Sequence, residues 1–283
     1  MNDKNRNLLL RVLSSMVLLP TVLALVWGGG FWTAGLLATA TAICASEYYQ
    51  ITLGKLTPAG WVGIIGSGMM PLFPVWAAGG QHRAPEHAGD ISFWWAAFFF
   101  FFFWAYHLIR GPLADAPRIV AHLFTGFLYG GFGMTALSEL RMRPDGVKWI
   151  VVAMIITWAN DTMAYFAGRF LGKHKLYPEV SPNKTWEGFA GGVVGAVGGL
   201  FIYKHLFGGD LTPVDCVLVG LAGSVLGPLG DLCESMIKRA HGVKDSGKII
   251  PGHGGLLDRI DALLFNSPMV FLYVHFVRGM LGT

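Results

Sequence analysis

Charged residues are scarce in this chain: Asp, Glu, Lys and Arg make up 13% of its 283 residues, against roughly 25% in a typical soluble domain. Cysteine is also rare, and three residues are too few for a disulfide scaffold. The 39 glycines show no triplet period, which excludes a collagen. Apolar residues reach 53% and the mean hydropathy is +0.52, which excludes a disordered chain. The class that remains is a polytopic membrane protein.

Apolar stretches recur along the chain at the length that a membrane-crossing helix needs, about 20 residues. The first follows a basic N-terminus but is longer than the apolar core of a signal peptide, so we expect an uncleaved span. We predict an all-α, polytopic membrane fold with about nine transmembrane helices. They are expected near residues 8–28, 31–50, 59–79, 91–109, 119–138, 148–168, 188–206, 213–230 and 262–281.

The distribution of Lys and Arg predicts the orientation, because cytoplasmic loops collect positive charge. With the N-terminus inside, most of the 21 Lys and Arg residues fall in the inside segments. The loop 139–148 is a basic exception on the outside, with Arg141, Arg143 and Lys148. We therefore expect a cytoplasmic N-terminus, with the two sizeable polar segments, 169–187 and 231–261, on the same side.

The polar segment 231–261 carries two acidic pairs on either side of a basic, glycine-rich loop. Asp231 and Glu234 share one helix face with Lys238, and Asp258 and Asp261 are likewise three residues apart. Carboxylates can hold a hard divalent cation, which together with nearby Lys and Arg neutralises phosphate charge. The alternative is a solvated loop between two helices. Metal-assisted phosphate chemistry is favoured, because carboxylates at a membrane boundary are costly without partners.

The stretch 158–192 contains a second group of candidates. Asp161 lies inside the sixth apolar stretch, where an ionisable residue is a functional candidate; the alternative is a capping or packing role. Downstream, Ser181, Lys184 and Thr185 place hydroxyls beside a lysine, which suits an anionic ligand. Residues 168–173 are one residue short of a Walker A loop.

Three other features have structural interpretations of their own. Gly191, Gly195 and Gly199 recur at every fourth residue, which predicts close helix packing rather than catalysis. Glu47, at the end of the second stretch, is a weaker functional candidate that can instead snorkel to the cytoplasmic interface. His253 lies within the glycine loop, and both a functional and a structural role are open for it.

The two polar segments resemble the CDP-diacylglycerol synthase family, also called phosphatidate cytidylyltransferases. The family's C-terminal signature has the form Ser-x-apolar-Lys-Arg, four residues, Lys-Asp, then Pro-x-His-Gly-Gly and Asp-Arg-x-Asp. The signature is matched in register by Ser235, Lys238, Arg239, Lys244, Asp245, Pro251, His253, Gly254, Gly255, Asp258, Arg259 and Asp261. The stretch from Asp161 to Gly188 resembles the family's second block, whereas residues 1–150 match only as apolar spans.

The resemblance implies that phosphatidate and CTP react to give CDP-diacylglycerol and pyrophosphate, for phospholipid biosynthesis, with Mg²⁺ as the cofactor. The family is associated with a paired-cation centre, which leaves K⁺ open as a second ion. The expected partners are CTP, phosphatidate and other membrane lipids, with no nucleic acid, and a homodimer is what the family suggests. The active site would face the cytoplasm at the cell (inner) membrane.

The family's pattern also assigns roles to residues of this sequence. The implied metal ligands are Asp231, Asp258 and Asp261, within a catalytic set that adds Lys238, Arg259 and Asp161. The implied substrate-binding residues are Ser181, Lys184, Thr185, Ser235, Arg239, Lys244 and His253. We expect residues 1–150 to form about five N-terminal spans and residues 151–283 to form the catalytic region, with cytoplasmic loops 169–187 and 231–261.

Two other functions are consistent with parts of the pattern. A CTP-dependent enzyme acting on another lipid phosphate or a lipid alcohol would use the same metal and nucleotide residues. An anion transporter is the alternative from a different class, with Asp161 and the basic loops along its path. Transporters often contain internal repeats, and the halves of this sequence show none.

Overall fold

The computed structural model describes residues 3–79, 88–207, 210–250, 252 and 254–279. The chain forms two compact units: the first comprises Met1–Val147 and His241–Arg259, and the second comprises Lys148–Ala240 and Ile260–Thr283. The two functional regions expected from the sequence, 1–150 and 151–283, stay a prediction.

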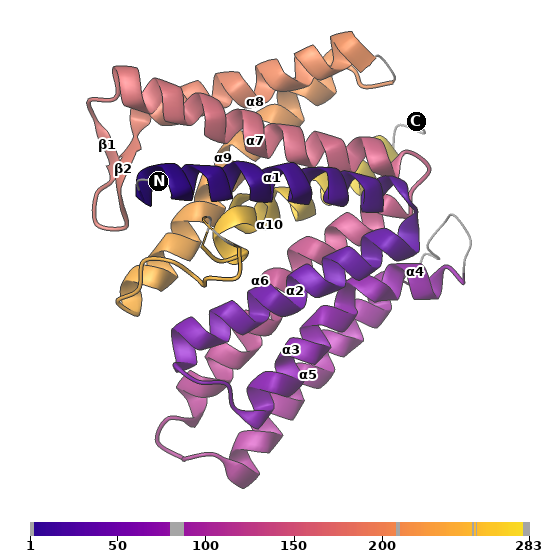
Figure 1. Ribbon diagram of the computed structural model, residues 1–283. Helices are drawn as coiled ribbons and strands as arrows, with labels where there is room; N and C mark the ends of the chain where they lie inside the picture. Colours follow the sequence, from indigo (N-terminus) through magenta and orange to yellow (C-terminus); the bar gives the residue numbers. More distant parts are fainter. Residues whose placement is uncertain (1–2, 80–87, 208–209, 251, 253, 280–283) are drawn as a thin grey trace. The chain divides into compact units, whose positions relative to one another are not determined.

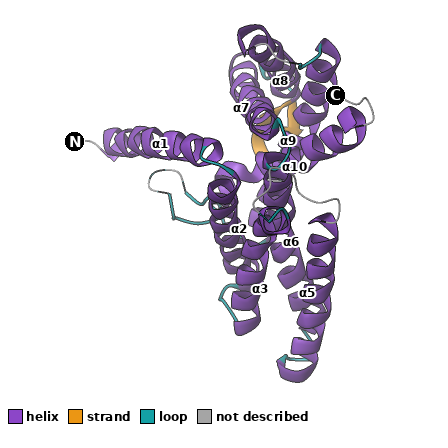
Figure 2. Cartoon of the chain, turned by 90° about the vertical axis from the view of Figure 1, so that its right-hand side faces the viewer, coloured by secondary structure: helices purple, strands orange, loops and turns teal. Residues whose placement is uncertain are grey.

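The first unit is a bundle in which α2, α3, α5 and α6 run side by side (Figures 1 and 2). Gly54 ends α2 at a φ of 72°, and Thr57 caps α3 by accepting the Gly60 N–H at 3.1 Å, with Pro58 in the first helical position. The elements are α1 (Asp3–Trp27), α2 (Gly30–Leu53), α3 (Pro58–Met69), the 3₁₀ turn η1 (Met70–Leu72), α4 (Phe73–Ala77), α5 (Ala88–Arg110) and α6 (Ala116–Arg141).

Buried polar contacts hold α2 and α3 against α6. The Tyr49 hydroxyl donates to the Leu123 carbonyl at 2.7 Å, and the Ser67 hydroxyl donates to the Phe127 carbonyl at 2.7 Å. On α6, Gly126 lies between the two acceptors Leu123 and Phe127 in the sequence, and a Cβ at Gly126 would clash with the Tyr49 ring. The absence of a side chain at Gly126 lets α2 approach α6 closely. The hydroxyls of Tyr49 and Ser67 both have hydrogen-bond acceptors, so their burial in an apolar bundle is not penalised.

The second unit consists of long helices and one small hairpin, which lies beyond the ends of α7 and α8 (Figure 1). Its elements are α7 (Gly146–Leu171), β1 (Lys175–Tyr177), β2 (Ser181–Thr185), α8 (Trp186–Phe207), α9 (Pro213–Ala240), α10 (Leu257–Leu272) and the π-helical turn η2 (Tyr273–Arg278). The first residues of α7 and the first turn of α10, up to Val147 and Arg259, belong to the first unit. The strands pair antiparallel, with Lys175 opposite Thr185. The predicted all-α class is confirmed, and the polar segment 169–187 adds this hairpin to it.

The glycine stripe of α8 packs on α7, as its spacing predicts. A Cβ at Gly195 would lie 2.5 Å from the carbonyl oxygen of Ala159, and a Cβ at Gly199 would lie 3.0 Å from the Cβ of Ala159. A Cβ at Gly191 would clash with Ala167. Because the backbones approach so closely, any side chain at Gly195 has to separate the two helices.

An ionic cluster links η2 to Asp210, which lies shortly before α9. Arg278, only 4% exposed, donates to the Asp210 carboxylate at 2.7 Å and to its backbone carbonyl at 3.0 Å. Lys148 also pairs with that carboxylate. The hydrogen bond from Lys148 and its charge lower the pKa of Asp210, so this carboxyl is ionised at neutral pH.

Seven helices of the described chain are long and apolar enough to cross a membrane by length and composition. They are Pro58–Ala77, Asp90–Arg110, Ala116–Arg141, Gly146–Leu171, Trp186–Phe207, Pro213–Ala240 and Leu257–Arg278. Met16–Trp27 of α1 is an apolar helix of shorter length, and α2 is helical without meeting the criterion for a candidate span. Seven of the nine predicted spans therefore coincide with candidate membrane helices.

Candidate active site

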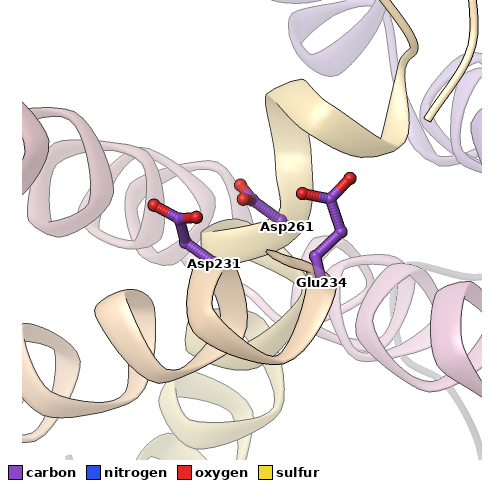
Figure 3. A group of neighbouring side chains, drawn as sticks. All are labelled: Asp231, Glu234 and Asp261. Carbon is purple, nitrogen blue, oxygen red and sulfur yellow. The ribbon is translucent and has the colours of Figure 1, made fainter. Parts of the chain in front are cut away.

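Three acidic side chains of the second unit come together where α9 and α10 meet. Asp231 and Glu234 lie one turn apart on α9, and Asp261 lies on α10; Figure 3 shows the three side by side. Each offers one carboxylate oxygen, and these oxygens all lie within 4.8 Å of one another. Three hard oxygen ligands at such spacing can hold a divalent cation. Asp231, Glu234 and Asp261 are called the acidic cluster below.

Small residues on α9 allow this convergence. A Cβ at Gly230 would lie 2.6 Å from the carbonyl oxygen of Asp261 and 2.8 Å from the Phe265 ring. A Cβ at Gly227 would lie 3.0 Å from the Asn266 amide nitrogen. The two helices therefore approach at glycines, and this close approach brings Asp261 beside the residue that follows Gly230, which is Asp231.

Two lysines partly balance the charge of the acidic cluster. The Lys184 ammonium, which comes from β2, lies 2.7 Å from an Asp231 oxygen and 3.4 Å from the Pro228 carbonyl. Lys238 donates to Glu234 at 2.7 Å within α9, and both of these side chains are buried. Three carboxylates thus meet two ammonium groups. A bound cation would offset the remaining negative charge.

A cavity of about 610 Å³ opens beside Asp231, within the 300–1,000 Å³ typical of small-molecule sites. Its walls come from α7, the hairpin, α8 and α9, and they carry Asp161, Arg169, Lys175, Lys184 and Asp231. Cationic and anionic groups at one cavity suit a ligand that brings both phosphate and metal.

Asn160 is a polar cavity-lining residue that the sequence did not single out as a site. Its side chain is 1% exposed, and both amide atoms are without a hydrogen-bond partner within the described residues. An unsatisfied buried amide is costly. A ligand in the cavity could supply the missing bonds.

The hairpin is positioned by hydrogen bonds at its base. Glu187 accepts the backbone N–H groups of Lys173 and His174, and its carboxylate lies 2.6 Å from the His174 ring nitrogen. Thr185 accepts the Gly188 N–H at 3.0 Å and so caps α8. Among the three expected binding residues of this strand, Lys184 and Thr185 line the cavity, whereas Ser181 lies at the far end of β2 and does not.

The remaining predicted residues are distributed over both units. In the second unit, Ser235 donates to Asp231 at 3.2 Å, and Arg239 is exposed at the end of α9. In the first unit, Lys244 and Arg259 are exposed, and one Asp258 oxygen accepts hydrogen bonds from the loop that precedes α10. His253 lies outside the described residues.

Glu234 is the member of the acidic cluster that the predicted ligand set omits. Its spacing of three residues from Asp231 was the available signal, because that spacing places both on one helix face. Asp258 is a predicted ligand, and the sequence alone does not show that its carboxylate accepts hydrogen bonds from the loop that precedes α10.

Comparison with known proteins agrees with these features. The cytidylyltransferase family model matches residues 9–277. The chain is 50% identical over 147 residues to a phosphatidate cytidylyltransferase of Bacillus subtilis (strain 168), which is 52% of this chain and 54% of that protein. A phosphatidate cytidylyltransferase of Staphylococcus haemolyticus is 44% identical over 151 residues, and one of Brucella abortus biovar 1 is 43% identical over 152. Each match spans about 55% of the relative.

The matched residues of the family model extend over almost the whole chain and include the acidic cluster, the cavity and the hairpin. The chain spans about half the length of the curated relatives it matches. On the extent of the family match, the chain belongs to the cytidylyltransferase family.

Proposed function

We propose that this protein transfers the cytidylyl group of CTP to phosphatidate, giving CDP-diacylglycerol and pyrophosphate. The observation that carries the proposal is the acidic cluster beside a cavity lined by Arg169, Lys175 and Lys184, in a chain of the cytidylyltransferase family. Relatives at 43–50% identity over about half their length are named phosphatidate cytidylyltransferases. A site for two anionic reactants needs this combination of acidic and basic groups.

The chemistry of the donor set fits Mg²⁺, because the acidic cluster offers hard carboxylate oxygens. Asp231, Glu234 and Asp261 would hold the ion, which when bound would neutralise phosphate charge and polarise the reacting phosphoryl group. Several carboxylates close together would also accommodate K⁺ as a second ion. Asp258 stays a predicted ligand from the resemblance.

In the proposed reaction a phosphate oxygen of phosphatidate attacks the α-phosphorus of CTP. A new P–O bond forms there, and the bond to the bridging oxygen breaks, so that pyrophosphate leaves with the electron pair. Lys184, Lys175 and Arg169 would neutralise the phosphates and orient the two anions, which otherwise repel each other. Arg239, Lys244 and Arg259 are exposed and would add positive charge for the incoming substrates.

The finer topology is part of the same proposal. We infer nine spans, with α1 and α2 joining the seven candidate helices, a cytoplasmic N-terminus, and a site that faces the cytoplasm of the cell membrane, where CTP is available. A homodimer is carried over from the family. Labelling of single cysteines introduced at Lys173 and Lys248 by an impermeant maleimide should occur in inverted vesicles and fail in intact cells. Labelling in intact cells would contradict this orientation.

The function is tested by pyrophosphate release from the detergent-solubilised protein. We expect release to require CTP, phosphatidate and Mg²⁺ together, to stop on chelation, and to yield a CDP-lipid. Release with another lipid phosphate or a lipid alcohol alone would retain the chemistry and change the substrate. A folded protein that releases no pyrophosphate with any lipid would contradict the proposal and favour an anion transporter.

Removing the cation that pairs with Asp231 should weaken catalysis strongly. In Lys184→Met we expect kcat/KM to fall about 10²-fold, because a charge that faces both the acidic cluster and the cavity is lost. Lys184→Arg should lose less, about 10-fold, since the charge stays while the geometry changes. Initial rates at varied CTP measure both effects.

Lys173→Met is the matched control for Lys184→Met. Lys173 precedes the same hairpin, is exposed and does not line the cavity. Its activity should stay within about twofold of the parent, because an exposed cation contributes little to a site it does not contact. Equal losses in Lys173→Met and Lys184→Met would mean that general surface charge, and not the position of Lys184, matters.

A further inference from the structure

Glu47 is a buried carboxylate in the N-terminal half of the chain, and it contacts residues about 200 positions away. It lies near the end of α2 and is 5% exposed. Its Oε1 accepts the Leu256 N–H at 3.0 Å, and its Oε2 accepts the Leu257 N–H at 2.8 Å. Its Oε2 also lies 3.2 Å from the Ser246 hydroxyl. All four residues belong to the first unit.

These contacts are made at the start of α10. The first N–H groups of a helix have no partner within the helix, and a carboxylate near them is favoured by the helix dipole. Asp258 accepts the Gly255 N–H at 3.0 Å and the Ser246 N–H at 2.9 Å. Glu47 and Asp258 together therefore satisfy three consecutive N–H groups, those of residues 255, 256 and 257.

Two glycines of the loop between α9 and α10 make room for the Glu47 carboxylate. A Cβ at Gly247 would clash with Glu47 Oε1. A Cβ at Gly255 would lie 2.7 Å from Glu47 Oε2 and would clash with the Ser246 hydroxyl. The structure thus explains why these two positions are glycines, which the sequence did not suggest. The loop packs around a carboxylate that comes from α2.

We propose that Glu47 is a positioning residue for the reaction, acting through the loop between α9 and α10 and through the first turn of α10. The loop carries Lys244, the first turn carries Asp258 and Arg259, and the same helix continues to Asp261 of the acidic cluster. Glu47 fixes these groups without contacting substrate. The catalytic part of this inference rests on the proposed function.

The test compares Glu47→Gln with Glu139→Gln. Gln at position 47 keeps the side-chain volume but turns one acceptor into a donor that faces N–H groups. Glu139 is a partly buried carboxylate near the end of α6 in the same unit, and it makes none of the loop hydrogen bonds described above, so Glu139→Gln makes the same chemical change elsewhere. We expect kcat to fall at least about 30-fold in Glu47→Gln, a KM for CTP within about threefold of the parent, and activity within about twofold in Glu139→Gln.

A readout independent of activity is trypsin cleavage in the loop, where Lys244 and Lys248 are exposed. Loss of the carboxylate should open the loop, and cleavage after these two lysines should become at least about 10-fold faster in Glu47→Gln. Cleavage at other sites and the melting temperature should stay close to those of the parent. We also expect the Mg²⁺ concentration for half-maximal activity to rise about 10-fold, because α10 carries Asp261.

Parent-like loop cleavage in Glu47→Gln would overturn the anchoring, and faster cleavage with parent-like kcat would overturn the positioning role. If Glu47→Gln does not fold, Gly247→Ala disturbs the same contact from the loop side and should show the same pattern. A parent protein that releases no pyrophosphate would refute the proposed function, while the cleavage comparison would still decide whether Glu47 holds the loop.

Discussion

Asp231→Asn and Asp261→Asn should each lower the rate of the proposed reaction, the formation of CDP-diacylglycerol, by about 10³-fold, equivalent to roughly 4 kcal/mol of transition-state stabilisation. Each substitution keeps the side-chain volume but removes one negative charge from three carboxylates whose ligand atoms lie within 4.8 Å of one another. The proposed cation would then be held weakly or not at all. Initial rates over a range of Mg²⁺ concentrations measure the loss.

If Asp231 and Asp261 bind the metal, the activity of these variants should also depend on the Mg²⁺ concentration. Raising Mg²⁺ should restore part of the activity, because the defect is in occupancy of the acidic cluster. Asp145→Asn, which changes an exposed carboxylate in the turn before α7, is the control and should keep the parent rate. Near-normal activity of Asp231→Asn or Asp261→Asn at low Mg²⁺ would show that these residues are not metal ligands.

Gly195→Leu should lower the stability of the protein strongly, although Gly195 lies outside the site. Its Cβ alone would lie 2.5 Å from the carbonyl oxygen of Ala159 and 2.6 Å from the Cβ of Met163, so α7 and α8 have to separate. Overpacking of this kind costs about 1–3 kcal/mol or more, and close packing is a main source of helix association in a membrane. Size-exclusion profiles and melting temperatures of the solubilised protein measure the effect.

Gly198→Leu provides the matched control on the same helix. Apart from its own helix, none of the described residues has an atom within 4 Å of the position that a Cβ at Gly198 would take, so the side chain of a leucine there starts in open space. Its yield and melting temperature should stay close to those of the parent. Equal yields of folded Gly195→Leu and Gly198→Leu protein would contradict the packing argument.

The sequence predicted those features that depend on local periodicity or on a specific motif. Apolar length identified the helices, and the four-residue glycine spacing on α8 identified a packing face, because both patterns repeat along one helix. The family followed from a gap-free signature around Asp258 and Asp261, and the match to residues 9–277 confirms it. The hairpin at Lys175 was not predicted, since its strands are short and β2 contains a proline.

The acidic cluster and the loop contacts could be predicted only in part. Asp231 and Asp261 lie 30 residues apart and meet because α9 and α10 approach at Gly230, a contact with no period of its own. An aspartate such as Asp258 can be a metal ligand or can cap a helix, and the sequence does not distinguish the two. The structure shows that its carboxylate accepts hydrogen bonds from the loop. Glu47 was the hardest to assign, since its partners lie 199 to 210 residues further on.

The sequence separation between Glu47 and its partners has a consequence for biosynthesis. A ribosome adds about 5–20 residues per second, so the Leu257 N–H is made roughly 10–40 s after Glu47, which it follows by 210 residues. During that interval the carboxylate has to be hydrated or protonated, because an unpaired charge is expensive in a bilayer. Unless it is protonated, the Glu47 carboxylate therefore has to stay in contact with water until residue 257 has been synthesised. Closure of the loop over Glu47 can then begin only after α9 has been synthesised, because the loop follows that helix in the chain.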